Sequence, residues 1–295
     1  MERRPKVAGA VRRGGFAAVG VPRLNAPAAA YTRSEVMKTM TAEQLSALGR
    51  TLFAGLATGL GGLLALGPKP TPRTMAGAMG FAAGVMTAVS LADLLPTALA
   101  WYRRAFPPEG AALALASLLC MGMALAALLE RCLPEPEAAG LDARQAGALR
   151  SGLITGAALV LHNLPEGVLT LFSGAADSAL GLRMALAVAL HNLPEGLAVA
   201  LPLYYAIGSR RRALGAAFAS GLAEPAGAIL AFALVGGRLR PGFLNGLLVL
   251  VAGVMVWVSL AQLVPTALTF GGRRAGAAGF GAGVAVMAIG IALLS

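Results

Sequence analysis

Two copies of one hexapeptide hold every histidine of this 295-residue chain. His-Asn-Leu-Pro-Glu-Gly occurs at 162–167 and again at 191–196, each time inside a long apolar stretch. The histidine and the glutamate of each copy are four residues apart, which places both side chains on one face of a helix. Imidazole nitrogens and carboxylate oxygens are ligands for first-row cations such as Zn²⁺, Fe²⁺ and Mn²⁺. The doubled motif therefore predicts a divalent-cation site with the ligands His162, Glu166, His191 and Glu195.

Further polar side chains accompany the doubled motif. Asn163 and Asn192 add amide oxygens, which suit harder cations or complete a labile ligand shell. Glu224 lies in the apolar segment SGLAEPAGAIL, and Asp93 lies in SLADLLP. Met86 offers a thioether two helical turns before Asp93, although methionine is equally an ordinary apolar core residue. These residues are candidates to extend the site.

The proline of each hexapeptide allows a competing interpretation. Proline has no N–H, so it frees the backbone carbonyl four residues earlier and kinks its helix. The freed carbonyls would belong to Leu161 and Leu190. One copy alone could therefore be a kinked helix with a polar contact to a neighbour, whereas two copies on consecutive helices supply four facing ligands.

The glycine after each glutamate allows another backbone to approach closely.

The composition predicts an all-α, polytopic membrane protein. Hydrophobic residues make up 57% of the chain and charged residues only 13%, and the mean hydropathy is +0.74. Soluble domains are about 25% charged. Apolar runs of about 18 or more residues indicate transmembrane helices. Eight such runs occur, at about 51–67, 75–100, 110–130, 151–173, 180–206, 213–236, 243–269 and 275–294. The lipid bilayer is thus an expected partner.

The net charge of +11 is explained by its location, and we expect no nucleic-acid partner. Short joints on the side that would hold both termini, side A, carry five arginines, and the opposite joints, side B, carry ten Lys or Arg. By the positive-inside rule, side B faces the cytoplasm. Side A has Arg103, Arg104, Arg183, Arg238 and Arg240, and side B has Lys69, Arg73, Arg131, Arg144, Arg150, Arg210, Arg211, Arg212, Arg273 and Arg274.

Residues 1–44 form a basic leader ahead of an eight-span domain at 45–295, in which the longest side-B joint is 131–150. The Arg-rich, acid-poor leader resembles an organellar transit peptide. A disordered basic tail, or a start codon placed too early, are the alternatives. A later start would leave Thr41 as the N-cap of the first helix. The expected location is a plasma membrane or an organelle, such as the chloroplast envelope or an endomembrane.

A second repeat relates more distant spans. Residues 80–99 and 249–268 match at 13 of 20 positions with a constant offset of 169. These segments lie in the second and seventh runs, which cross in opposite directions, as do the fourth and fifth runs. One pseudo-two-fold axis would relate both pairs and, by extension, the first run to the eighth and the third to the sixth. Such a 3+2+3 inverted-repeat arrangement is typical of secondary transporters.

At these residues the chain resembles the ZIP (Zrt/Irt-like) family of divalent-metal transporters. Both hexapeptides and the AEPAGA segment look most like the branch that contains the bacterial zinc-uptake transporter. The resemblance covers residues from about 45 to 295. The resemblance implies transport of zinc, and also iron or manganese, into the cytoplasm, without a prosthetic group and often as a homodimer. It implies one or two adjacent ions bound by His162, Asn163, Glu166, His191, Asn192, Glu195 and Glu224, with Met86 matching a ligand of some members and Asp93 a polar position near the pore.

Two features depart from the family pattern. Many members carry a His-rich loop between the third and fourth spans, whereas residues 131–150 contain no histidine. Metal sensing by this loop is therefore in doubt. Asn192 is an aspartate in some relatives, and the neutral residue removes one negative charge from the site.

Other functions fit the sequence less well. An intramembrane metalloprotease needs H-E-x-x-H, and each histidine here is followed by asparagine, so we expect no enzyme. Cys120 and Cys132 form no C-x-x-C pair, which favours small buried residues over a thiolate metal site. A metal-gated channel or a membrane metal sensor is the alternative to a transport cycle.

Overall fold

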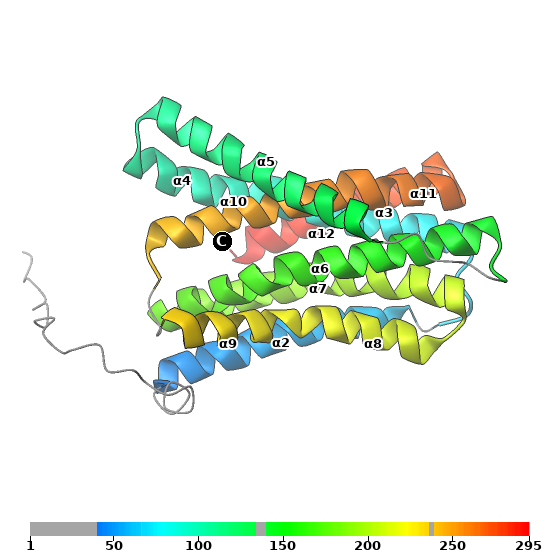
Figure 1. Cartoon of the computed structure of the whole chain (residues 1–295), viewed down its shortest axis with the longest axis horizontal. Coiled ribbons are helices and arrows are strands. Elements are labelled where there is room, and N and C mark those ends of the chain that lie inside the picture. The colour runs from blue at the N-terminus through cyan, green and yellow to red at the C-terminus, as the bar shows by residue number, and fades with distance from the viewer. Residues whose placement is uncertain (1–39, 66, 134–139, 236–238, 295) are drawn as a thin grey trace, which may run out of the picture.

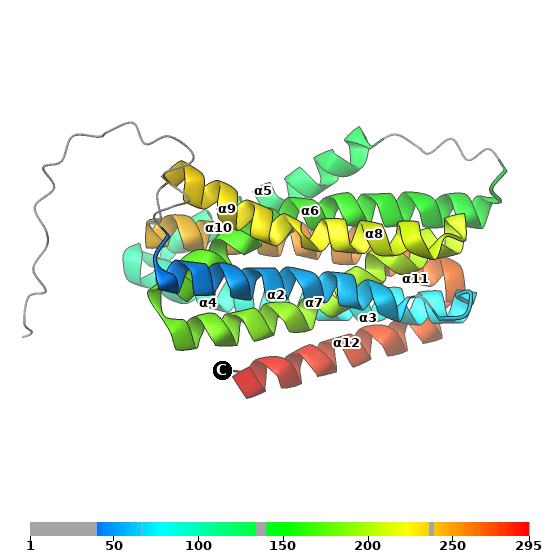
Figure 2. The same ribbon diagram turned by 90° about the horizontal axis from the view of Figure 1, so that it is seen from below.

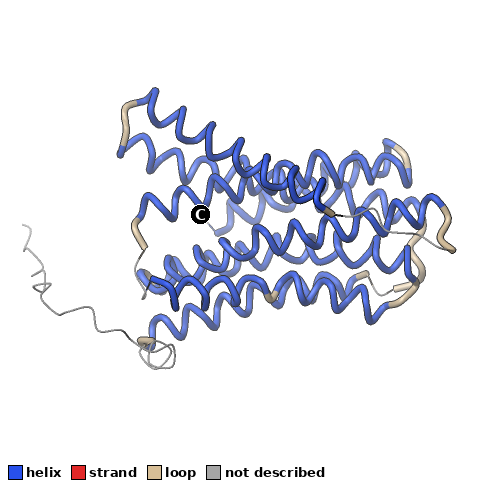
Figure 3. The backbone as a smooth tube through the Cα atoms, viewed as in Figure 1, coloured by secondary structure: helices blue, strands red, loops and turns tan. Residues whose placement is uncertain are grey.

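The computed structural model of the chain is a bundle of long helices (Figure 1), and it describes residues 40–65, 67–133, 140–235 and 239–294. The described residues contain helices and short connections and no strand (Figure 3). Eight helical segments in this part of the chain are long and apolar enough to cross a membrane, which confirms the predicted all-α membrane class. The predicted leader, except for its last residues, and the middle of the 131–150 joint lie outside the described residues.

The first three spans are α2 (Ala42–Leu64), then α3 (Pro72–Val89) continued by η1 (Ser90–Leu94) and α4 (Leu95–Ala105), and α5 (Pro108–Cys132). The next two are α6 (Ala143–Ala176) and α7 (Ser178–Ile207). The last three are α8 (Arg210–Gly221) with α9 (Ala223–Val235), then α10 (Pro241–Trp257) with η2 (Val258–Leu263) and α11 (Val264–Gly271), and α12 (Arg273–Leu294).

Several spans extend beyond the apolar runs that predicted them because their first turns are capped. Thr41 is the N-cap of α2, as predicted, and shares a reciprocal capping box with Gln44. Asp142 and Gln145 start α6 in the same way, eight residues before the apolar run. Charged residues such as Arg144 therefore lie on helical ends rather than in loops.

The interruptions of the helices fall at other places than the two hexapeptides. α6 and α7 run without a break through Pro165 and Pro194. The sixth span is interrupted at Leu222, between α8 and α9. The second and seventh spans each contain a π-helical turn, η1 and η2, and both turns end at matching positions of the long repeat, Leu94 and Leu263. Such π turns insert one extra residue in a helix and occur often at functional sites.

The bundle divides into two groups of four spans by the contacts of its glycines. A Cβ on Gly61 of α2 would overlap the carbonyl oxygen of Leu193 in α7, and one on Gly227 of α9 would overlap that of Leu164 in α6. A Cβ on Gly55 of α2 would likewise overlap the carbonyl oxygen of Gly221 in α8, so these contacts unite spans 1, 4, 5 and 6, which we call the first group. A Cβ on Gly84 of α3 would overlap a carbonyl of α12, and one on Gly122 of α5 would overlap a carbonyl of α10. Spans 2, 3, 7 and 8 are the second group.

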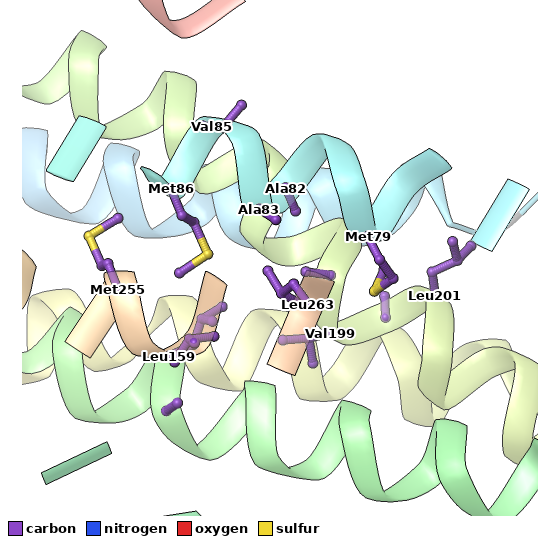
Figure 4. Close-up of a cluster of buried hydrophobic side chains, with 14 of the residues drawn as sticks. Met79, Ala82, Ala83, Val85, Met86, Leu159, Val199, Leu201, Met255 and Leu263 are labelled. Carbon is purple, nitrogen blue, oxygen red and sulfur yellow. The ribbon is translucent and has the colours of Figure 1, made fainter. Parts of the chain in front are cut away.

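Side chains rather than backbones fill the boundary between the two groups. Figure 4 shows Met86 and Met255 of the second group facing Leu159 of the first in one apolar cluster, which also includes Val199 and Leu263. Gly290 of α12 has its close contact across the boundary with a side chain, that of Leu190. Close backbone contact therefore links all four spans of the first group, and in the second group it links span 2 with span 8 and span 3 with span 7. Apolar packing joins the two groups, together with the hydroxyl contact between Ser151 of span 4 and Thr266 of span 7.

The predicted pairing of the first run with the eighth and the third with the sixth is wrong. Span 1 packs along span 5 as span 6 packs along span 4, and span 8 packs along span 2 as span 3 packs along span 7. If spans 2 and 7 correspond, and spans 4 and 5, these contacts match span 1 with span 6 and span 3 with span 8, and the two-fold arrangement itself stays a prediction. A repeat with a constant sequence offset keeps the order of the spans. The span before span 2 therefore matches the span before span 7, which is span 6 and not span 8.

The connections alternate between the two ends of the bundle (Figures 1 and 2). The α4–α5 turn lies at the end where α2 begins, which is side A, whereas α6, α8 and α12 begin at side B. The third and eighth spans are the least buried, so they face lipid. Cys120 and Cys132 lie exposed on α5, which corrects the expectation that they are buried.

The glycine contacts make a prediction about stability. Gly84→Ala should destabilise the protein by about 1–3 kcal/mol, because its Cβ would push α3 off the backbone of α12. Gly77→Ala on the same helix is the matched control, because a Cβ there meets nothing within 4 Å. Thermal unfolding of purified protein in detergent measures both. Equal midpoints for the two variants would contradict the close packing of α3 on α12.

Candidate metal centre

The two hexapeptides face each other because α6 and α7 are consecutive, antiparallel and packed side by side (Figure 1). His162 Nε2 lies 3.3 Å from Glu195 Oε1, and His191 Nε2 lies 2.9 Å from Glu166 Oε1. Each histidine thus pairs with the glutamate of the other motif and not with the one on its own helix. All four side chains are buried, so the two pairs form one polar centre in an apolar bundle.

The asparagines fasten this centre to the neighbouring spans. Asn163 Nδ2 donates to the carbonyl oxygen of Ser220 in α8 at 3.1 Å, and Asn192 Nδ2 donates to that of Ala54 in α2 at 2.9 Å. Asn192 Nδ2 also contacts Glu224 Oε1, which brings the carboxylate of span 6 into the centre. The amide nitrogens therefore hold the two asparagine side chains in place, and the amide oxygens accept no hydrogen bond from the described residues.

The glycines of the hexapeptides permit this proximity, as predicted. A Cβ on Gly167 would overlap the carbonyl oxygen of Glu224, and one on Gly196 would overlap that of Thr58. Only a residue without a Cβ allows two backbones to come so close. These contacts bring span 6 against α6 and span 1 against α7 at the level of the polar centre.

One atom of each predicted ligand in the centre has no hydrogen-bond partner among the described residues. A buried polar atom without a partner costs about 1–3 kcal/mol, so a native protein keeps such atoms for a reason. The atoms are all of kinds that bind first-row cations. They are His162 Nδ1, Asn163 Oδ1, Glu166 Oε2, His191 Nδ1, Asn192 Oδ1, Glu195 Oε2 and Glu224 Oε2.

The centre is arranged as two pairs rather than as a closed cluster. Within the described residues, no group of three or more His, Cys, Asp or Glu side chains is gathered as a metal site. Each pair uses one histidine nitrogen and one carboxylate oxygen for itself. A cation held by several of these residues would therefore replace the two histidine–glutamate contacts.

Asp93 lines a cavity that also borders the polar centre. This cavity, of about 50 Å³, is lined by Asp93 of η1, Glu166 and Thr170 of α6, and His191 of α7. Glu166 and Thr170 follow His162 toward the side-A end of α6, so the cavity lies on that side of the two pairs. Asp93 thus lies beside two of the predicted ligands, and its place near a pore stays a prediction.

Met86 lies in different surroundings from the other candidates. It is fully buried in the apolar cluster, near Met255 and Leu159 (Figure 4). Leu159 precedes His162 by three residues, toward side B. The thioether is thus on the side-B face of the centre, and its role as a ligand stays a prediction.

Sequence reasoning missed two threonines. Thr170 lies one turn after Glu166 on the same face of α6, a spacing that could have identified it. Thr58 has a buried hydroxyl without a hydrogen-bond partner among the described residues, and it lies against Gly196 as Glu224 lies against Gly167. The signal was a short match, because GLAT at 55–58 parallels GLAE at 221–224.

The fold and the site define the class of polytopic membrane proteins with a functional centre of ionisable side chains inside the bundle. The family model described as ZIP Zinc transporter matches residues 136–294. The chain is 43% identical over 260 residues to zinc transporter ZupT of Corynebacterium glutamicum, which covers 84% of this chain and 99% of the relative. Its identity to ZupT of Chlorobium phaeovibrioides is 39% over 260 residues, covering 84% of this chain and 98% of the relative.

A more distant relative, zinc transporter ZupT of Streptococcus mutans, is 35% identical over 251 residues and covers 82% of this chain and 95% of the relative. The chain belongs to the ZIP family of zinc transporters. The family is one of transporters and not of enzymes, in agreement with the absence of H-E-x-x-H.

The cross-helix pairs predict a measurable coupling. In metal-free protein, the combined change His162→Ala with Glu195→Ala should be less destabilising than the sum of the two single changes, by about 1–3 kcal/mol. Either single change leaves a buried partner unpaired, and the second removes that penalty. Unfolding of the two single variants and the double variant in detergent with a chelator gives this value.

Asn163→Ala with Glu195→Ala is the control cycle, because Asn163 is fastened to Ser220 instead. The control should show a smaller coupling. Coupling as large in the control as in the His162–Glu195 cycle would contradict the specific pairing.

Proposed function

We propose that this protein carries Zn²⁺ across the membrane from side A to side B, into the cytoplasm, through the centre formed by the two hexapeptides. The observation that supports this most is the set of seven buried ligand atoms without hydrogen-bond partners among the described residues. They come from three spans of one group and surround two cross-helix pairs. Membership of a zinc-transporter family gives the cargo.

We propose that His162, Glu166, His191 and Glu195 bind the ion first. The ion takes the position between α6 and α7 that the histidine–glutamate contacts now hold, and Glu224 with the two asparagine oxygens shapes an adjacent position. Fe²⁺ and Mn²⁺ are further proposed cargoes, because mixed nitrogen and oxygen ligands discriminate weakly among these ions. The neutral Asn192 favours this breadth.

The surroundings of the centre support entry from side A. The cavity beside His191 and Glu166 extends on that side, with Asp93 as the acidic group that a cation would meet. On the side-B face, the apolar cluster around Leu159, Met86 and Val199 covers the centre. A hydrated cation cannot pass such a layer without a change of packing.

The two groups of spans supply the proposed motion. All seven ligands belong to the first group, whereas Asp93 and Met86 belong to the second. Glycine contacts hold neighbouring spans within each group together, and the packing between the groups is mostly apolar, which allows one group to slide or rock against the other once the Ser151–Thr266 contact separates. The contacts between spans agree with one pseudo-two-fold axis that would relate span 1 to span 6, span 2 to span 7, span 3 to span 8 and span 4 to span 5. We infer this axis for the 3+2+3 arrangement.

The bacterial origin of the relatives favours the plasma membrane and gives no support to the chloroplast envelope or an endomembrane. The excess of positive charge on side B orients that side to the cytoplasm. A homodimer stays a prediction. The lightly buried third and eighth spans offer faces to lipid or to a second copy.

Removing one carboxylate of the centre should stop transport. In vesicles with an enclosed zinc-sensitive dye, Glu195→Gln should lower Zn²⁺ influx at least about tenfold, since even outer partners of bound metals cost about 10–100-fold when removed. Glu109→Gln, the same change at an exposed helix start, is the control and should leave influx unchanged. Equal influx in both variants would refute the assignment of Glu195.

A disulfide across the group boundary should also stop transport. Ser151 of span 4 and Thr266 of span 7 have hydroxyl oxygens 2.9 Å apart, so Ser151→Cys with Thr266→Cys would join the two groups. We expect oxidation to abolish influx and dithiothreitol to restore it. The alternative function, a metal-gated channel without a transport cycle, would still conduct after cross-linking.

The matched control joins two spans of the same group. Thr87 and Ser259, of spans 2 and 7, have hydroxyl oxygens 2.6 Å apart. Oxidation of Thr87→Cys with Ser259→Cys should leave influx intact, in a background where Cys120 and Cys132 are replaced by alanine. Inhibition of both cross-linked variants would argue against motion between the groups.

A further inference from the structure

A second binding region lies on the outer surface of the second group, away from the polar centre. Two cavities meet at Arg273, the first residue of α12. One, of about 510 Å³, is lined by Arg73, Arg273 and Arg274 at the side-B end of the bundle. The other, of about 480 Å³, continues from Arg273 along the membrane-facing surface between α3, α11 and α12. Figure 2 shows α11 and α12 meeting at that end beside the start of α3.

The basic cavity has the charge for an anion and no internal neutralisation. Arg73, Arg273 and Arg274 are exposed, and none of them has an ion pair or hydrogen bond to any residue that the structure describes. The described lining of both cavities contains no carboxylate. The N-terminus of α12, with its positive end of the helix dipole, opens into the same place.

The second cavity is a groove with the chemistry of a hydrocarbon chain. Its walls are apolar, and Leu260 and Leu268 are about half exposed, at 51% and 47%. From Arg273 to Phe280 the groove follows α12 for about 10 Å, at 1.5 Å per residue. Its lining includes Leu260, Val264, Leu268, Ala277 and Phe280.

A headgroup pocket and an apolar groove that share one arginine match one molecule, an anionic phospholipid. We propose that this region binds an anionic phospholipid of the side-B leaflet, with the phosphate on the three arginines and an acyl chain in the groove. The cytoplasmic leaflet, which side B faces, is the one rich in anionic lipid, and basic pockets between transmembrane helices on this side bind such headgroups. A free anion would use the arginines but would leave the groove without a function.

The position gives the lipid a structural effect. Gly80 and Gly276 both line the groove, and a Cβ on Gly80 would overlap the carbonyl oxygen of Gly276. The acyl chain therefore lies over the line of close contact between α3 and α12, and it touches α11 as well. Bound lipid stabilises the packing of these three helices in the second group, against which the first group moves.

The experiment uses the full chain in dodecyl maltoside, titrated with dioleoyl phosphatidylglycerol and, separately, dioleoyl phosphatidylcholine. Native mass spectrometry counts bound lipid, and thermal unfolding measures stabilisation, since a ligand of the folded state raises the midpoint. We expect phosphatidylglycerol to bind and raise the midpoint and phosphatidylcholine to do neither. The triple variant Arg73→Gln, Arg273→Gln, Arg274→Gln should bind phosphatidylglycerol roughly 100-fold more weakly.

Two matched variants separate the lipid site from general charge. Arg131→Gln, Arg211→Gln, Arg212→Gln removes the same charge from exposed residues of the same side and should keep phosphatidylglycerol binding. Ala277→Trp fills the groove without a change of charge and should lose it. If the triple variant does not fold, Arg274→Gln alone and Ala277→Trp carry the test.

Three results would overturn the proposal. Unchanged phosphatidylglycerol affinity in both the triple variant and Ala277→Trp would remove the site. A midpoint raised as much by inorganic phosphate as by phosphatidylglycerol would show an anion site without an acyl chain. A shift from dimer to monomer in the triple variant, with lipid binding unchanged, would show that a second copy of the chain occupies this face.

Discussion

The crossed pairing of two histidines with two glutamates is the constraint on which the arrangement of this bundle depends. Ionisable groups inside a membrane are costly unless they are paired, and here neither helix can satisfy its own groups. α6 needs the glutamate of α7 for His162, and α7 needs the glutamate of α6 for His191. The two helices must therefore be antiparallel, in close contact and in one register, and the remaining spans are placed around them.

Glycine and asparagine convert this pairing into a larger rigid unit. The carbonyls of Ala54 and Ser220 accept from the two asparagines in equivalent ways, and Thr58 and Glu224 lie against equivalent glycines. Spans 1 and 6 are thereby fastened to the polar centre by backbone contact. The other four spans contact this unit mostly through methionine, leucine and valine side chains, which tolerate a change of neighbours far better than the one hydroxyl pair between them, Ser151 and Thr266, does.

The sequence predicted the parts of this structure that depend on composition and local spacing. Eight apolar runs gave the spans, and the i, i+4 spacing gave a common face for His162 and Glu166. The crossed pairing could not be read from either helix, because it depends on how the two rotate toward each other. The π turns were equally hidden, since SLAD and SLAQ look like ordinary α-helix. The wrong partner for span 1 arose because the axis was extended from two pairs of spans without knowledge of which helices are in contact. The shared GLA before Thr58 and Glu224 pointed to span 6 instead.

The two π turns give the second and seventh spans the same kind of backbone irregularity. η1 covers Ser90–Leu94 and η2 covers Val258–Leu263, and both end at equivalent leucines in segments that share 13 of 20 residues. Over the five matched positions of the two turns only Asp93 and Gln262 differ. Asp93 lines the cavity beside His191, whereas Gln262 is a buried neutral amide. The same backbone distortion thus presents an ionisable group in one span and an uncharged one in the other.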